Sequence, residues 1–482
     1  MRLFSFVPGK TRPAWGKFSA LLILSLLSGC SLAPEYIRPE APVPDFLGSP
    51  EEPALAPASG IGWRDFFADP GLRELIAASL IHNRDLKTAA LAVAEAQALY
   101  GVENAERFPQ AETGAENNMT GGFDGRSSRN NYQIALMPSF ELDFFGRLRN
   151  LGEAALQEYL ATEEAEKSVR ISLISQVAQS YFALLLAREQ LQLAENTFKS
   201  RSQSYAFIES RVQSGQSSLL DLEQARSQVE AAQAETAMRR REVVQTANAL
   251  QLLSGSFSGK AAPSLEPVPL AEQTLARLPA GIASSVLLTR PDVMAAEHRL
   301  LGSHANIGAA RAAFFPSISL TGNLGYMSGD LSGLFSESSA FWSFVPKISL
   351  PIFSGGRLSA NLELAEIRRE AAVVQYEKAI QTAFREVADA LLSQASFADQ
   401  IAAQERYLAS QRLVSDLATD RYANGAASYL EVLDAQRSIL QAEQNLLNIR
   451  RDQLMNAVNL YSALGGGLIS SDLEQDPAAG DQ

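Results

Sequence analysis

Two stretches of this sequence, about two hundred residues apart, share one pattern: "SRVQSGQSSLLDLEQARS" (residues 210–227) and "DRYANGAASYLEVLDAQRS" (residues 420–438). Glycine tolerates the positive φ angle at which a helix reverses, and a serine followed three residues later by an acid predicts a capping box. The matched residues each lie 210 positions apart: Arg211 with Arg421, Gly215 with Gly425, Ser218 with Ser428, Leu220 with Leu430, and Asp221 with Glu431. We therefore expect each stretch to be the turn of a helical hairpin. The second capping box should be complete, and the first a looser version.

Long segments without proline flank both turns. No proline occurs between Pro138 and Pro263, or between Pro351 and Pro477. The segments are rich in Ala, Leu, Glu and Gln, which favour helix. They predict one helix from Arg147 to about Gln213 that returns to about Leu253, and another from Arg357 to Tyr422 that returns to about Leu464. At 1.5 Å per residue each outgoing helix would be about 100 Å long, a length that suits a coiled coil better than a globular core.

Alternating apolar and polar residues precede each helical hairpin. The pattern is clear in "YQIALMPSFELDFF" (132–145), "SISLTGNLGY" (317–326) and "FWSFVPKISLPIF" (341–353), and weaker in "QAETGAENNMT" (110–120). A period of two predicts half-exposed strands. We expect two β-hairpins, at 109–145 and 315–353, with loops at 121–128 and 328–335 and strands of about 9–11 residues, the length that crosses a membrane.

The two halves of the chain form an internal repeat. "RFP" (107–109) corresponds to "FFP" (314–316), and "GRL" (146–148) corresponds to "GRL" (356–358). A further helical pattern runs from Pro70 to Pro109. We place the first repeat at 70–262 and the second at 263–465, each with the order helix, β-hairpin, helical hairpin. Residues 466–482 are expected to form a flexible tail.

The N-terminal residues predict export and lipidation. Basic residues precede a short apolar run, Phe18–Leu27, and "LSGC" then ends at Cys30. Ten apolar residues are too few to span a bilayer as a helix, but they suit a signal peptide, which we place at 1–29. "LSGC" resembles a bacterial lipobox, so Cys30 is the expected lipidation site; a small buried thiol is the alternative. Residues 30–69, rich in Pro, Ala and Glu, predict an extended tether.

Composition and motifs limit the possible functions. Without residues 1–29 the chain has 37 basic and 54 acidic residues, a net charge of −17, with no basic cluster that would predict nucleic-acid binding. Cys30 is the single cysteine, and His298 and His304 are six residues apart, a spacing that does not suit a metal site. These histidines are interpreted as solvated helix positions. No nucleotide-binding or hydrolase motif occurs. We expect no enzyme activity, metal or cofactor apart from the lipid on Cys30.

The predicted elements have a consequence for assembly. Four strands cannot close a barrel, and an open sheet edge is not tolerated in lipid. Two, three or four chains would have to combine their strands, and the long helices would extend the wall on one side. The sequence therefore predicts an oligomeric conduit tethered to a membrane.

The chain resembles outer-membrane factors of the TolC/OprM type and, among these, the lipoproteins. The resemblance rests on the lipobox, on "PEYIRP" (34–39), on the paired hairpins and on the tip "YANGAASYLEVLDAQRS" (422–438). It implies a mainly α protein with a membrane β-barrel. Three chains would form a 12-stranded barrel in the outer membrane, continuous with a 12-helix α-barrel in the periplasm. The implied partners are a periplasmic adaptor protein and an inner-membrane pump of the RND type.

The resemblance also assigns roles at the tips. Glu431 and Asp434 match acids that form a constricting ring at the periplasmic gate, and Tyr422 matches an aromatic residue that can lock neighbouring coils. For Glu431, helix capping alone is the alternative. Some family members carry an arginine where this chain has Ala427. The contacts that would close the gate, and its resting state, are therefore not predicted.

The repeated tip residues are candidates for adaptor docking: Arg211, Gly215, Ser218, Arg421, Gly425 and Ser428. For the two arginines, interaction with a helix C-terminus is an equally weighted alternative. The resemblance implies the exit duct of a tripartite efflux pump that passes drugs or other small molecules. The alternatives are a type I protein secretion duct and, in another class, a periplasmic coiled-coil adaptor lipoprotein. The two strand hairpins favour the duct.

Overall fold

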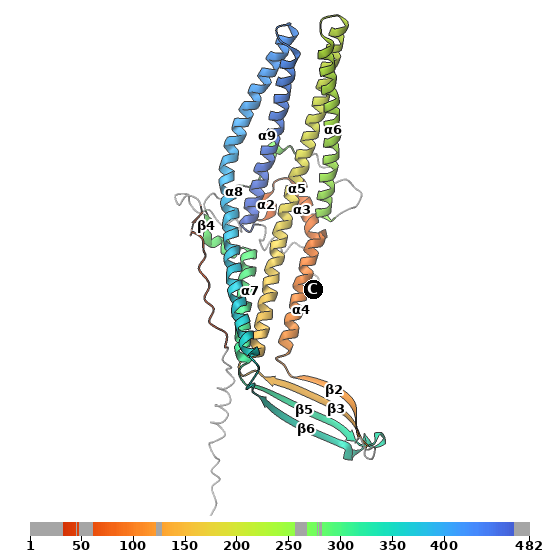
Figure 1. The fold of residues 1–482 in the computed structure, drawn as a ribbon, viewed down its shortest axis with the longest axis vertical. Helices are drawn as coiled ribbons and strands as arrows, with labels where there is room; N and C mark the ends of the chain where they lie inside the picture. Colours follow the sequence, from red (N-terminus) through yellow and green to blue (C-terminus); the bar gives the residue numbers. More distant parts are fainter. Residues whose placement is uncertain are drawn as a thin grey trace, which may run out of the picture. The chain divides into compact units, whose positions relative to one another are not determined.

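Four long helices dominate the computed structural model, which describes residues 32–44, 46–47, 61–121, 128–255, 268–276, 278 and 282–466. They are α5 (Arg147–Gln213) and α6 (Leu219–Ser254), followed in the second repeat by α8 (Arg357–Ala423) and α9 (Tyr429–Ala463). Figure 1 shows α5 beside α6 and α8 beside α9. α5 and α8 each have 67 residues; α5 has the predicted bounds, and α8 ends one residue after the predicted Tyr422.

The shorter helices correct one prediction. The pattern from Pro70 to Pro109 forms two helices, α3 (Pro70–His82) and α4 (Arg84–Ala105), instead of one. Asn83, with φ −64° and ψ 135°, separates them. Its Oδ1 accepts from the N–H groups of Asp85 and Leu86, and its Nδ2 donates to the carbonyl of Leu253. The side chain of Asn83 thus starts α4 and ties it to α6, an effect that helical periodicity does not reveal.

The four predicted strands form one antiparallel sheet in the order β2-β3-β5-β6. Their bounds are β2 (Gln110–Gly121), β3 (Ser128–Leu142), β5 (Ser317–Ser328) and β6 (Ala340–Ser349). β6 ends four residues before the predicted Phe353. The register aligns the predicted apolar positions in rows across the sheet: Leu136 faces Leu324, which faces Trp342 on the other side. One face of the sheet is therefore apolar, as the alternation predicted.

The predicted tether is in part a packed segment. Tyr36 donates a hydrogen bond at 3.0 Å to Glu297, which lies in α7 (Pro291–Ala312). Arg38 forms a bidentate ion pair with the same carboxylate. The Tyr36 ring meets His304 edge-on at 5.4 Å, and burial lowers the pKa of His304. His304 is therefore not the solvated position that we expected.

Two further parts of residues 30–69 are structured. Strand β1 (Phe46–Leu47) pairs with β4 (Ile282–Ala283). Phe66, in the short helix α2 (Trp63–Phe66), is fully buried and stacks on Tyr461 with ring centroids 4.1 Å apart. The folded chain thus begins well before Pro70. Apolar and ion-pair contacts to residues far along the chain explain why local composition gave the wrong boundary.

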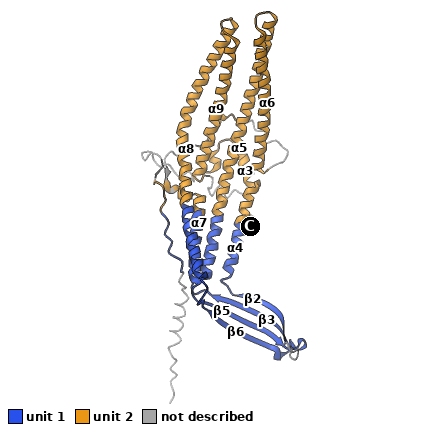
Figure 2. Cartoon of the chain, viewed as in Figure 1, with its two compact units in different colours: residues 1–39, 93–162, 296–376 blue, residues 40–92, 163–295, 377–482 orange. Residues whose placement is uncertain are grey.

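The chain forms two compact units that do not coincide with the two repeats (Figure 2). Unit 1 comprises residues 1–39, 93–162 and 296–376, and unit 2 comprises residues 40–92, 163–295 and 377–482. Unit 1 contains the sheet, and unit 2 contains both helical tips. Each unit is built from both repeats, because strands and helices of the two repeats pack against each other.

The helical tips as a candidate gate and docking site

Both helical hairpins reverse at the predicted glycine. Gly215 and Gly425 have the same φ angle, 72°. The N–H of Gly215 donates to the carbonyl of Val212, and that of Gly425 to the carbonyl of Tyr422, each at 3.0 Å. A Cβ atom at either glycine would meet nothing within 4 Å. Glycine is favoured here for its left-handed backbone and not for lack of space.

The capping boxes are the reverse of the prediction. At the first tip the box is complete: the N–H of Asp221 donates to the hydroxyl of Ser218, and the Asp221 carboxylate accepts from the N–H of Ser218. At the second tip Ser428 makes no side-chain capping bond, and the N–H of Glu431 donates to the Ser428 carbonyl instead. The longer Glu431 side chain turns to Arg421, with Nη1 and Oε1 3.5 Å apart.

Tyr422 connects the two tips. Its hydroxyl lies 3.2 Å from Oγ of Ser217, which in turn donates to the carboxylate of Asp221 at 3.0 Å. The guanidinium of Arg211 lies over the Tyr422 ring, 5.4 Å from its centroid, and donates to the carbonyl of Ala423. The aromatic residue that the resemblance assigned to a lock therefore contacts the opposite tip within one chain.

The two repeated arginines have different surroundings. Arg211 is half-buried against the second tip, whereas Arg421 stays within its own tip, paired with Glu431 and donating to the carbonyl of Ala426. Both make contacts beyond the backbone end of their own helix. A simple helix-terminus role is thus incomplete for either residue.

The proposed gate acids lie on one exposed side of α9. Glu431 and Asp434 are exposed, and the intervening Val432 and Leu433 are buried. Asp434 pairs with Arg437 one turn along the same helix, at 3.4 Å. Both carboxylates are thus directed away from the helical core and only loosely paired.

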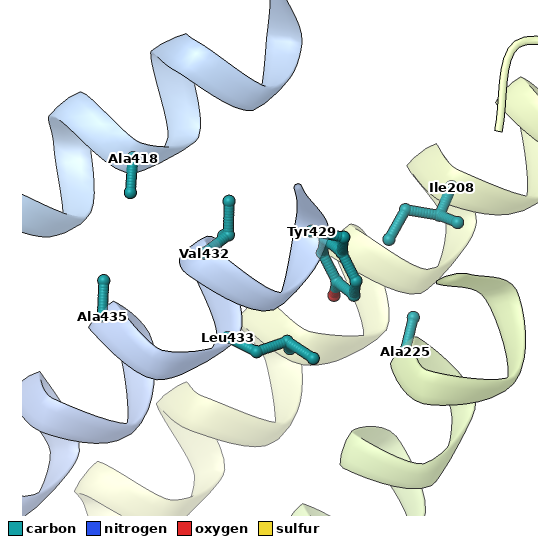
Figure 3. Close-up of a cluster of buried hydrophobic side chains, with 7 residues drawn as sticks. All are labelled: Ile208, Ala225, Ala418, Tyr429, Val432, Leu433 and Ala435. Atoms are coloured by element: carbon teal, nitrogen blue, oxygen red, sulfur yellow. The ribbon is translucent and has the colours of Figure 1, made fainter. Parts of the chain in front are cut away.

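A buried cluster fixes the position of this acidic side. Tyr429 and Leu433 of α9 point toward Ile208 of α5 and Ala225 of α6, as Figure 3 shows. On the other side of α9, Val432 and Ala435 point toward Ala418 of α8. The cluster fixes the rotation of α9 about its axis, and with it the direction of the acids.

Several residues of the tips were not predicted from the sequence as site residues. Ser217 makes the central hydrogen bonds, and Leu219 and Leu220 are 67% and 66% exposed at the start of α6. Two adjacent exposed leucines form an apolar surface suited to a protein partner. The signal was available, since both follow the predicted helix cap directly.

Other predicted sites lie elsewhere. Cys30 falls outside the described residues. Within the described ranges, no group of three or more His, Cys, Asp or Glu side chains is arranged to hold a metal ion.

Comparison with known proteins decides the family. The sequence profile of the family "Outer membrane efflux protein" matches residues 75–256 and 282–466. The chain belongs to the outer membrane efflux protein family. The profile thus matches the chain twice, once in each half.

Three members of the family illustrate the likeness. The chain is 49% identical over 445 residues to the cation efflux system protein CusC of Escherichia coli K12, covering 92% of this chain and 97% of CusC. It is 45% identical over 458 residues to the probable outer membrane lipoprotein SilC of Salmonella typhimurium, covering 94% and 99%. It is 45% identical over 466 residues to the toluene efflux pump outer membrane protein TtgI of Pseudomonas putida, covering 94% and 98%.

A solved structure agrees with this assignment. A crystal structure of CusC superposes with a TM-score of 0.84 at 48% identity, covering 91% of this chain and 100% of the other. This efflux-family chain is an exit channel of the outer membrane. The channel prediction is confirmed, and the adaptor alternative is not supported.

Proposed function

We propose that three copies of this chain form a passive duct, with a 12-stranded β-barrel in the outer membrane and a 12-helix α-barrel in the periplasm. The observation that carries the proposal is the four-stranded sheet. β2 and β6 lie at its two ends, and among the described residues neither has a strand partner on its outer side. Open edges are not tolerated in lipid, so neighbouring chains must supply the missing partners.

The exposed apolar side chains of the sheet support a lipid-facing surface. Leu324 is 61% exposed, Trp342 76% and Ile348 70%. Outward apolar residues flanked by aromatic rings are typical of outer-membrane barrels. In water such an apolar surface would promote aggregation, whereas in lipid it stabilises the barrel.

The acidic side of α9 would line the gate. In a trimer, Glu431 and Asp434 would place six carboxylates around a narrow axis. Such a ring attracts cations and repels anions. The partners Arg421 and Arg437 are exposed, so both ion pairs can exchange with water at little cost.

The remaining partners follow from the same proposal. A periplasmic adaptor would contact the exposed tips, including Leu219 and Leu220, and an RND-type pump would supply the energy. A lipid on Cys30 would anchor the chain to the outer membrane. CusC is described as a cation efflux protein and TtgI as a toluene efflux protein, which supports a duct that leaves substrate choice to its pump. We infer that it passes drugs or other small molecules or ions, and efflux is favoured over protein secretion.

The test is single-channel conductance of the purified chain in planar bilayers. We expect a small, cation-selective wild-type conductance, and a larger, less selective one for Glu431→Ala/Asp434→Ala. The matched control is Asp416→Ala/Asp420→Ala, which removes two exposed acids of α8 near the same tip and should leave selectivity unchanged.

The mass of the detergent-solubilised protein, measured by light scattering, should be that of three chains. An unaltered pore in the double alanine variant would restrict Glu431 and Asp434 to structural roles. No conductance from a folded trimer would refute the duct itself.

A further inference from the structure

Arg201 of α5 is a buried cation without an anionic partner. The residue is 6% exposed, and among the described residues no ion pair or hydrogen bond joins it. The Nη1 atom is buried with no acceptor. Burial lowers the pKa of Arg201, yet an arginine keeps its charge in proteins. An unpaired buried charge is strongly unfavourable, so this position needs an explanation.

Arg201 lines an open cavity of about 620 Å³ between α5, α8 and α9. Two acids on the cavity wall already have partners. Glu443 pairs with Arg412 at 2.8 Å, and Glu189 accepts from the N–H of Leu270 at 2.7 Å. A further wall residue, Arg450, pairs with Glu405. The charge of Arg201 therefore remains uncompensated beside a cavity that can hold a ligand.

Two more buried polar atoms near Arg201 lack hydrogen-bond partners. Oε1 of Gln436 belongs to a residue of the same cavity wall, and the hydroxyl of Tyr429 is buried without a bond. Tyr429 and Arg201 are close enough to affect each other's pKa. Oε1 of Gln436 can only accept a hydrogen bond, so the donors that the cavity wall offers to an anion are the guanidinium of Arg201 and Nε2 of the Gln436 amide.

We propose that this cavity binds a small oxyanion, a phosphate or a carboxylate, held by the guanidinium of Arg201 with Nε2 of Gln436 as the second donor. The planar guanidinium matches the two oxygens of either group. The ligand would compensate the buried charge and connect α5 to α9. The residues belong to a single unit of a single chain, so the site does not depend on the trimer or on the gate.

The experiment measures anion binding to the full-length protein in detergent. Sodium phosphate or sodium acetate replaces chloride at constant ionic strength, with binding followed by calorimetry and melting by circular dichroism. We expect saturable binding of phosphate, acetate or both, accompanied by a rise in melting temperature. Arg201→Gln should bind at least about tenfold more weakly, since it removes the charged fork. Its melting temperature should no longer depend on the anion.

Two further variants make the result specific. Arg240→Gln removes an exposed arginine that pairs with Glu195 outside the cavity, and it should bind as the wild type does. Gln436→Leu keeps the charge and removes one donor, and it should weaken binding even if Arg201→Gln does not fold. Binding of phosphate alone or acetate alone would support the site and identify its ligand. No saturable binding of either anion, or equal binding by Arg201→Gln, would overturn the proposal.

Discussion

The two helical tips share a sequence pattern, a glycine angle and a backbone turn, yet their side chains perform different tasks. The first tip closes its own capping box through Ser218 and Asp221, and Ser217 extends that network to Tyr422. The second tip has Ala427 in place of Ser217 and Glu431 in place of Asp221. Without the second hydroxyl and with a longer acid, it makes no side-chain cap.

A duplicated turn can thus keep its backbone while its side chains diverge. The backbone turn favours glycine for its positive φ angle, since a Cβ atom at Gly215 or Gly425 would meet no neighbouring atom within 4 Å. The side-chain contacts of the two tips differ because Glu431 has one methylene more than Asp221 and Ala427 lacks the hydroxyl of Ser217. Freed from capping, Glu431 points outward with Asp434, while the first tip supplies structural contacts.

The largest difference should come from the first residue of the returning helix. Tyr429 is 4% exposed in the cluster of Figure 3, whereas its counterpart Leu219 is 67% exposed. Tyr429→Ala should lower the free energy of unfolding by about 3 kcal/mol, because it removes a large buried ring. Leu219→Ala should change it by less than about 0.5 kcal/mol. Chemical denaturation followed by circular dichroism checks both, and similar losses would contradict the asymmetry of the tips.

An intermediate difference should appear at the two capping serines. Ser218→Ala should cost about 1 kcal/mol of stability, because its hydroxyl accepts from the N–H of Asp221. Ser428→Ala should cost no more than about 0.5 kcal/mol, since its side chain makes no cap. The same denaturation experiment applies. A larger loss for Ser428→Ala would mean that the second capping box forms after all.

The smallest difference is expected between the two repeated arginines, in how the stability lost on substitution depends on salt concentration. Arg421→Gln breaks an exposed ion pair with Glu431 and should cost at most about 0.5 kcal/mol, an effect that disappears in about 1 M salt. Arg211→Gln removes contact with the Tyr422 ring and should cost about 0.5–1 kcal/mol at any ionic strength. Melting in low and high salt checks this, and identical salt dependence would refute the distinction.

Features with a local cause were predictable. The two 67-residue helices follow from the absence of proline and the composition of their segments, and the glycine turns follow from a conformation that few residues adopt. The apolar face of the sheet follows from period two. Tyr422, Glu431 and Asp434 were found as tip residues because a family motif marks them.

Features that depend on contacts between residues far apart in the sequence were not predictable. The break at Asn83 depends on a hydrogen bond to Leu253, and the packing of Tyr36 and Arg38 depends on Glu297. Neither partner is near in sequence. The capping prediction failed because Glu431 had a competing partner, Arg421, across the turn.

The repeat, the periods of the helices and strands, and the places where the chain reverses can all be predicted from the amino-acid sequence, because each depends on a few neighbouring residues. Which faces of these elements pack together is seen only in the folded chain. Folding joins segments of both repeats into two compact units, orients α9 so that Glu431 and Asp434 face outward, and buries Arg201 beside a cavity. These outcomes depend on contacts between residues far apart in the chain, which local patterns do not encode.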